Sequence, residues 1–233
     1  MKYFADLHIH SCLSPCGGED MTPNNIVNMA LLKGLDIIAV TDHNTARNLP
    51  AVDALAREAG LCLVPGLEVT TAEDVHMLTY FPDVERALAF SDEIYGLLPD
   101  IPLNARFFGE QTIMNEEDEP VGSIDRLLIS ALSESIEQLT ARARRHGGVC
   151  VPAHIDKESH GIIALLGFIN PHLGFRTVEV SPRGVAAGFS QYDPRLKVLS
   201  NSDAHDLGLI LERVQPLELA EKSAACFLKY LDS

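Results

Sequence analysis

Short apolar runs rich in valine, isoleucine and leucine alternate with longer amphipathic stretches over most of the chain, and this alternation limits the fold more than any other feature. Strand-like runs separated by helical stretches are typical of βα units and a parallel sheet. Seven such runs occur, at residues 3–7, 36–41, 62–67, 75–80, 148–153, 177–181 and 197–200. The sequence therefore predicts an α/β fold built on seven strands.

The amphipathic stretches predict helices at residues 22–33, 46–59, 84–97, 124–146, 162–169 and 217–230. The first has the clearest limits, because Thr22 can cap it, Pro23 suits the first helical position and Gly34 would end it. Residues 99–122 interrupt the alternation and predict a loop or hairpin insertion, whose acidic run at 116–119 favours a solvated turn over a binding element. Residues 1–233 fit a single α/β barrel domain.

The net charge limits which partners the chain can bind, and the cysteine content indicates its compartment. The chain has 33 acidic and 18 basic side chains, a formal charge of −15, which disfavours binding to nucleic acid. Bound divalent metals would reverse the potential within a single cleft, so short oligonucleotides stay open as partners. Five scattered cysteines do not resemble a disulfide framework and indicate a reducing cytoplasm. With no run of about 18 apolar residues, we expect neither export nor membrane insertion.

Six of the nine histidines fall at or near the predicted strand ends that we expect at one rim, where parallel α/β folds gather their active sites. A lone histidine is more often a core or surface residue than a ligand, but six at one rim favour a metal site. Four acidic residues, Asp6, Asp42, Glu68 and Asp203, fall at the same rim, and this donor mixture suits zinc, manganese or iron. The histidines are His8, His10, His43, His76, His154 and His205.

Spacing adds detail to this rim. His8 and His10 are two residues apart, so in an extended strand their rings point to the same side. Asp203 and His205 repeat this spacing, and in a closed barrel the last strand lies beside the first, which makes the two pairs neighbours. Glu68 follows a predicted strand and offers two oxygens that can bridge two ions; the alternative is an acid that interacts with a helix N-terminus.

Five motifs together resemble the polymerase and histidinol phosphatase (PHP) family. They are DLHIHS at residues 6–11, TDH at 41–43, PGLE at 65–68, PAH at 152–154 and NSDAH at 201–205. The resemblance implies a distorted (β/α)7 barrel and a site for two or three divalent ions of zinc, manganese or iron. It implies that one ion is held by His8, His10, Glu68 and Asp203, a second by Glu68, His76 and His154, and a third by His43 and His205.

The first loop departs from the family pattern, because Cys16 stands where some members place histidine. A thiolate can bind zinc or iron, so Cys16 is either a substitute ligand or a small loop residue without a metal contact. Arg183 is expected on the same rim, either paired with a substrate phosphate or solvated. Asp6 either orients a histidine ring or caps local backbone. His146, His160 and His172 are expected to be structural, and Lys157 is left outside the site.

The expected chemistry is hydrolysis of a phosphomonoester or phosphodiester by a metal-bound hydroxide, without a protein nucleophile. The expected substrate is a small phosphorylated molecule, such as a nucleotide or a histidinol phosphate-like compound. Three alternatives remain: a nuclease acting on short oligonucleotide ends, a related hydrolase attacking a C–N bond, and a noncatalytic PHP module that stabilises or regulates a protein partner. The near-complete ligand set favours the enzyme over the module.

Overall fold

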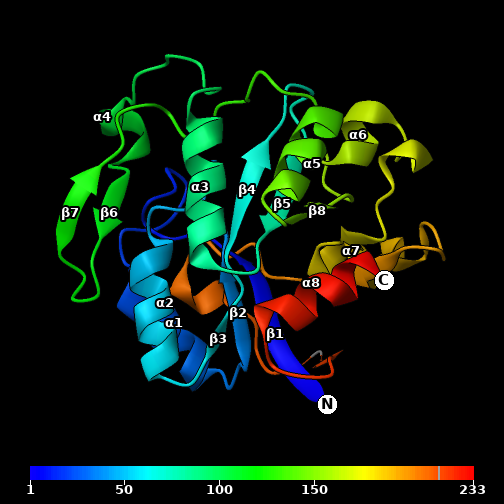
Figure 1. The fold of residues 1–233 in the computed structure, drawn as a ribbon, viewed down its shortest axis with the longest axis horizontal. Coiled ribbons are helices and arrows are strands. Elements are labelled where there is room, and N and C mark those ends of the chain that lie inside the picture. The colour runs from blue at the N-terminus through cyan, green and yellow to red at the C-terminus, as the bar shows by residue number, and fades with distance from the viewer. Residues whose placement is uncertain (215) are drawn as a thin grey trace.

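The computed structural model describes residues 1–214 and 216–233 and shows helices packed around central strands, with a hairpin of residues 112–123 at the edge (Figure 1). Strand β1 (Lys2–Ile9) pairs in parallel with β2 (Ile37–Val40), and β2 pairs in parallel with β3 (Cys62–Leu63). At the other edge of this sheet, β11 (Pro216–Glu218) runs antiparallel to the first residues of β1. Strands β9 (Thr177–Glu179) and β10 (Lys197–Leu199) form a separate parallel pair.

The third sheet corrects the predicted strand directions. Strands β4 (Gly66–Thr70), β5 (His76–Tyr80) and β8 (Val149–Pro152) lie in this order, and each neighbouring pair is antiparallel. The strand predicted at 75–80 is present, but its predicted parallel direction is wrong, because β5 is the returning arm of a hairpin. His76 lies at the beginning of β5, yet it pairs with Thr70 at the end of β4, so it still reaches the expected rim.

Isolated bridges connect these sheets next to the candidate ligands. His43 forms a parallel bridge with Glu68, and Ile9 forms one with Ala204. The predicted strand at 62–67 is divided into β3 and β4 around Pro65, whose missing N–H interrupts a ladder. A mixed α/β fold is thus confirmed, whereas the closed seven-stranded barrel stays a prediction.

Most helices form where the sequence places them. Thr22 caps α1 by accepting from the Asn25 N–H, and Gly34 follows the helix with a φ of 71°. The helix predicted at 124–146 begins only at Ile136, because Ser135 and Gln138 form a capping box there. The helices are α1 (Pro23–Leu32), α2 (Leu49–Glu58), α3 (Val84–Tyr95), α4 (Ala105–Phe108), α5 (Ile136–Arg145), α6 (Ile162–Leu166), α7 (Pro182–Ala186) and α8 (Ala224–Asp232), with short 3₁₀ turns at Pro171–Leu173, Phe189–Gln191 and Leu207–Leu209.

The helix predicted at 217–230 is wrong in its first part, because residues 217 and 218 belong to β11 and α8 starts only after the Ser223 cap. Residues 99–122 contain α4, β6 (Thr112–Met114) and the start of β7 (Pro120–Ser123), and β6 and β7 form an antiparallel hairpin. At its tip Asp118 accepts hydrogen bonds from the Thr22 hydroxyl at 2.6 Å and the Asn24 N–H at 3.1 Å. The hairpin is therefore tied to the beginning of α1.

Packing of alternate strand residues decides which side chains face the rim. Ala5 and Leu7 of β1 belong to a buried cluster that includes Phe227 of α8. Asp6 and His8 alternate with them and face the opposite side. Apolar packing on one side of β1 thus directs the polar side chains of the first motif toward the site. Within the described residues, no helix is long and apolar enough to cross a membrane.

Candidate metal centre

Glu68 is the centre of the histidine cluster and is only 1% exposed. Five imidazole rings, contributed by four separate segments of the chain, direct a nitrogen atom at its two carboxylate oxygens. The nitrogen–oxygen distances are 3.3 Å for His8, 3.3 Å for His10, 3.3 Å for His43, 2.9 Å for His76 and 3.1 Å for His154. One carboxylate thus faces five nitrogen donors within a buried space.

Asp203 adds the second carboxylate. Its Oδ1 lies 3.3 Å from His8 Nε2 and 3.2 Å from His10 Nε2, so the expected proximity of the first and last motifs is found. His154 and Asp203 both have positive φ, 26° and 53°. This region costs a non-glycine residue about 1–3 kcal/mol and persists where the surrounding contacts hold the backbone. The folded chain thus keeps two candidate ligands in strained positions.

Among the described residues, the candidate ligand atoms form three groups, each within 4.8 Å, and only the first group matches a set implied by the family resemblance. It joins His8, His10, Glu68 and Asp203. The second group joins His43 with Glu68 and His76, and the third joins His10 with Cys16 and His205. His43 thus lies with His76 instead of His205, and His154 contacts Glu68 from outside these groups. The exposed Cys16 is placed beside two of the rings.

The residues present fit a cluster of divalent ions. His8 Nε2 and His10 Nε2 face each other at 3.2 Å, and both also face Glu68. Among the described residues, Nδ1 of His43 and of His76 is buried and makes no hydrogen bond of good geometry, although these atoms face Glu68 at 3.3 and 2.9 Å. Buried polar atoms are normally paired, and imidazole nitrogen with carboxylate oxygen is the donor set of zinc, manganese and iron. Ions coordinated by this set would satisfy the nitrogen atoms that converge on Glu68.

The pKa values reflect this crowding. Burial opposes charge on His10, but the carboxylates of Asp203 and Glu68 outweigh it and raise the His10 pKa to about 9. Burial lowers the pKa of His43 well below its usual value, and Glu68 does not compensate for it. Although burial disfavours its charge, the surrounding imidazoles hold the pKa of Glu68 well below normal. Since metal ligands must be deprotonated, ion binding here would release protons.

Glu179 is a supporting residue that sequence reasoning missed. Its carboxylate oxygens lie 3.1 and 3.0 Å from His8 Nδ1 and accept from the His154 N–H at 2.9 Å and the Asn201 amide at 2.7 Å. A carboxylate on one ring nitrogen fixes the tautomer, which presents Nε2 of His8 to Glu68. The signal was a single charged residue inside the apolar run 177–181.

Two aspartates hold the loops around the site. Asp42 accepts from the Ser11 and Ser14 hydroxyls at 2.6 and 2.7 Å, and the Ser14 oxygen lies 3.1 Å from His10 Nδ1. Asp6 accepts from the Ser202 N–H and hydroxyl at 3.1 and 2.6 Å instead of contacting a ring. The suggestion that Asp6 orients a histidine is wrong, and the backbone groups that it binds, at Ser202 and Leu211, are distant in sequence instead of local.

A cavity of about 180 Å³ opens onto the cluster. It is lined by His43, Glu68, His76, His154, Lys157, Ser159, His160, Asp203 and His205. The ring of His160 stacks on that of His76 with centroids 4.2 Å apart, so His160 borders the site although only a structural role was expected. Arg183 lies exposed on α7 and is not part of this lining.

The fold and the histidine–carboxylate cluster define a mixed α/β protein with a candidate metal centre. The sequence profile of the PHP domain matches residues 6–174, which contain all candidate ligands except Asp203 and His205. The chain belongs to the PHP domain family.

Two curated relatives match shorter segments. An uncharacterised protein of Methanocaldococcus jannaschii is 38% identical over 77 residues, which are 30% of this chain and 45% of the relative. A 5'-3' exoribonuclease of Haemophilus influenzae is 32% identical over 66 residues, 28% of this chain and 23% of the relative. The match thus spans less than half the length of either relative.

A solved structure matches over the whole chain. The lesion-specific endonuclease Q of Pyrococcus furiosus is similar with a TM-score of 0.70 at 20% identity, and the match covers 100% of this chain and 56% of that protein. At this identity the likeness shows a shared fold.

Proposed function

We propose that this chain is a metal-dependent phosphoesterase that hydrolyses a phosphomonoester or phosphodiester at two or three divalent ions. The observation that carries the proposal is Glu68, one buried carboxylate faced by five imidazole nitrogens, with Asp203 beside two of them. Membership of the PHP domain family supports it, as do relatives named as nucleases.

The side chains of this site have separate tasks in the proposed reaction. His8, His10, Glu68 and Asp203 would hold one ion, while His43, His76 and His154 would complete the cluster around Glu68. When bound, divalent ions supply acidity to water and stabilise negative charge on phosphoryl oxygens. Glu179 and Ser14 keep the rings of His8 and His10 oriented, so these rings need no reorganisation during turnover. The cavity opens directly onto these ligands and admits the phosphoryl group.

Small phosphorylated molecules are the first substrate class in this proposal, because the formal charge of −15 repels long polyanions. Nucleic acid is the second class, and the names of the exoribonuclease relative and of endonuclease Q favour it. Hydrolysis of a labelled short oligonucleotide, compared with a nucleoside monophosphate at equal concentration, separates the two classes. Preferential cleavage of the oligonucleotide would make the nuclease the better assignment.

The central test combines elemental analysis of the purified protein with hydrolysis of p-nitrophenyl phosphate and bis-p-nitrophenyl phosphate. We expect two or three equivalents of zinc, manganese or iron and turnover of at least one ester. Glu68→Ala should lose most of the metal and at least about a thousandfold in turnover, since metal catalysis supplies several kcal/mol. Glu117→Ala, at an exposed residue of the hairpin, is the matched control. A metal-free, inactive protein in metal-replete medium would favour the noncatalytic module.

A further inference from the structure

Lys157 is the one lysine or arginine among the described residues that line the cavity over the metal centre. Its side chain is 38% exposed, and its Nζ contacts Oδ2 of Asp203. The other oxygen of Asp203 lies 3.3 Å from His8 Nε2 and 3.2 Å from His10 Nε2. A single carboxylate thus separates the ammonium group from the candidate metal ligands.

The loop that carries Lys157 is fixed on both sides. The Lys157 N–H donates to the His154 carbonyl at 2.9 Å, and the preceding residue, Asp156, accepts from the Ser181 N–H at 2.7 Å. Farther along, the His160 carbonyl accepts from the His76 N–H at 3.0 Å. A Cβ atom on Gly161 would lie 2.3 Å from the Lys157 carbonyl oxygen, so this turn requires glycine. Lys157 is therefore held over the cavity.

A phosphoryl group that enters this cavity meets the carboxylates of Glu68 and Asp203, so a cation in the lining favours its binding. Lysine is a common phosphate-binding residue and acts as a point charge with three donors. The Lys157 ammonium contacts Asp203 of the first group and lines the same cavity, so an anion bound at these ligands lies close to it. By contrast, Arg183, the cation expected from the sequence, does not line the cavity.

We propose that Lys157 binds a non-bridging phosphoryl oxygen of the substrate and favours phosphomonoesters over phosphodiesters. The inference rests on the proposed function and names the substrate class of that same site. A phosphomonoester carries about −1.5 to −2 at neutral pH, as phosphorylated side chains do, whereas a diester carries a single charge. Loss of one cation therefore weakens monoester binding more than diester binding.

The test compares the wild type with Lys157→Met, Lys157→Gln and Lys157→Arg, all loaded with the same metal. The probe is inorganic phosphate, measured by titration calorimetry and as an inhibitor, together with the metal content of each variant. For Lys157→Met we expect an unchanged metal content and a Kd for phosphate raised about tenfold or more, the usual effect of a charged hydrogen bond. The KM for p-nitrophenyl phosphate should rise more than that for bis-p-nitrophenyl phosphate, and Lys157→Arg should restore part of the affinity.

Lys229→Met, at an exposed lysine of α8, is the matched control and should bind phosphate like the wild type. An unchanged phosphate Kd in both Lys157→Met and Lys157→Gln would overturn the inference. So would a loss of metal parallel to the loss of phosphate binding, because Lys157 would then act only through Asp203. A metal-loaded wild type that neither binds phosphate nor hydrolyses either ester would instead remove the proposed function, and this inference with it. Circular dichroism identifies any variant that has not folded. The phosphate affinities of the folded variants then decide whether Lys157 binds the phosphoryl group.

Discussion

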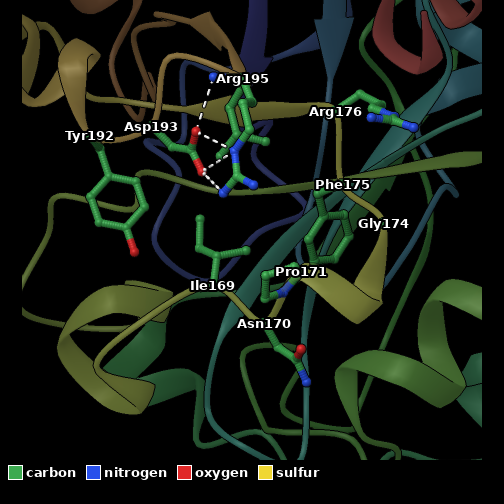
Figure 2. A pocket seen from close by; sticks show the side chains of 10 residues that line it. Ile169, Asn170, Pro171, Gly174, Phe175, Arg176, Tyr192, Asp193 and Arg195 are labelled. Atoms are coloured by element: carbon green, nitrogen blue, oxygen red, sulfur yellow. Dashed lines mark hydrogen bonds and ion pairs between the residues drawn. The ribbon is translucent and has the colours of Figure 1, made fainter.

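Two of the cavities among the described residues lie at opposite ends of β9 and β10 and contrast with each other. The larger, about 440 Å³, is lined in part by Phe175 and Arg176 just before β9 and by Asp193 and Arg195 before β10 (Figure 2). The smaller, about 180 Å³, lies over the metal centre, and Glu179 at the end of β9 reaches its ligands.

Their linings differ more than their sizes. In the larger cavity Figure 2 shows apolar side chains such as Ile169 and Phe175 around one ion pair, with Arg195 Nη2 2.6 Å from Asp193 Oδ2. That arginine is 76% exposed, and a surface pair of this kind contributes little. The smaller cavity collects imidazoles and carboxylates, among which burial lowers the pKa of His43 and the surrounding imidazoles lower that of Glu68. Converging buried polar groups, more than volume, indicate where chemistry takes place.

Metal binding should give the largest difference between the two regions. Protein stripped with a chelator and then supplied with zinc or manganese at about 100 times Kd should gain about 2.7 kcal/mol of unfolding free energy. For a domain of this size that corresponds to a rise in Tm of about 5–11 °C, measurable by calorimetry. Glu68→Ala should abolish the rise, while Asp193→Ala in the larger cavity should keep it. If both variants lost the rise in Tm equally, metal binding would not distinguish the smaller cavity from the larger one.

Glu179→Gln should have the next largest effect. The amide keeps the size of the side chain but not the negative charge beside His8 Nδ1, and such outer carboxylates typically contribute 10- to 100-fold in metal affinity. Competition with a chelating dye measures this change. Glu218→Gln, at an exposed residue of β11, is the control. Unchanged affinity in Glu179→Gln would show that the His8 ring is held by packing alone.

Cys16→Ser sharpens the question of a third ion. Cys16 is exposed and groups only with His10 and His205, so its loss should leave the ions around Glu68 in place. We expect elemental analysis to show a decrease of at most one equivalent, because a hydroxyl is a much weaker zinc ligand than a thiolate. Cys226→Ser is the control. A full complement of metal in Cys16→Ser would identify Cys16 as a loop residue without a metal contact.

The metal centre also shows which parts of the fold and of the site can be predicted from the sequence. His8 and His10 were predictable because strand residues two apart share a side, and apolar Ala5 and Leu7 decide which side that is. The direction of β5 was mistaken, since period-two alternation is the same in either direction. The short interval between the predicted strands 62–67 and 75–80 was the overlooked signal, because a parallel crossover needs a dozen or more residues.

Contacts between residues that are distant in the sequence could not be predicted from the sequence alone. Glu179 meets His8 from 171 positions away, and Lys157 meets Asp203 from 46 positions away. Neither pair has a local pattern, because each depends on which strand ends meet. A charged residue within a buried apolar run, such as Glu179, indicates that a polar partner must be present in the fold. The sequence does not identify that partner.

Arg195→Ala should produce the smallest effect of all. The ion pair with Asp193 is two residues apart along an exposed loop, so its loss leaves both groups hydrated and the metal ligands untouched. We expect metal content and Tm like those of the wild type and turnover of both p-nitrophenyl esters within about a factor of two. A clear fall in turnover with full metal content would mean that the two ends of β9 and β10 are coupled, and the larger cavity would then join the functional part of the molecule.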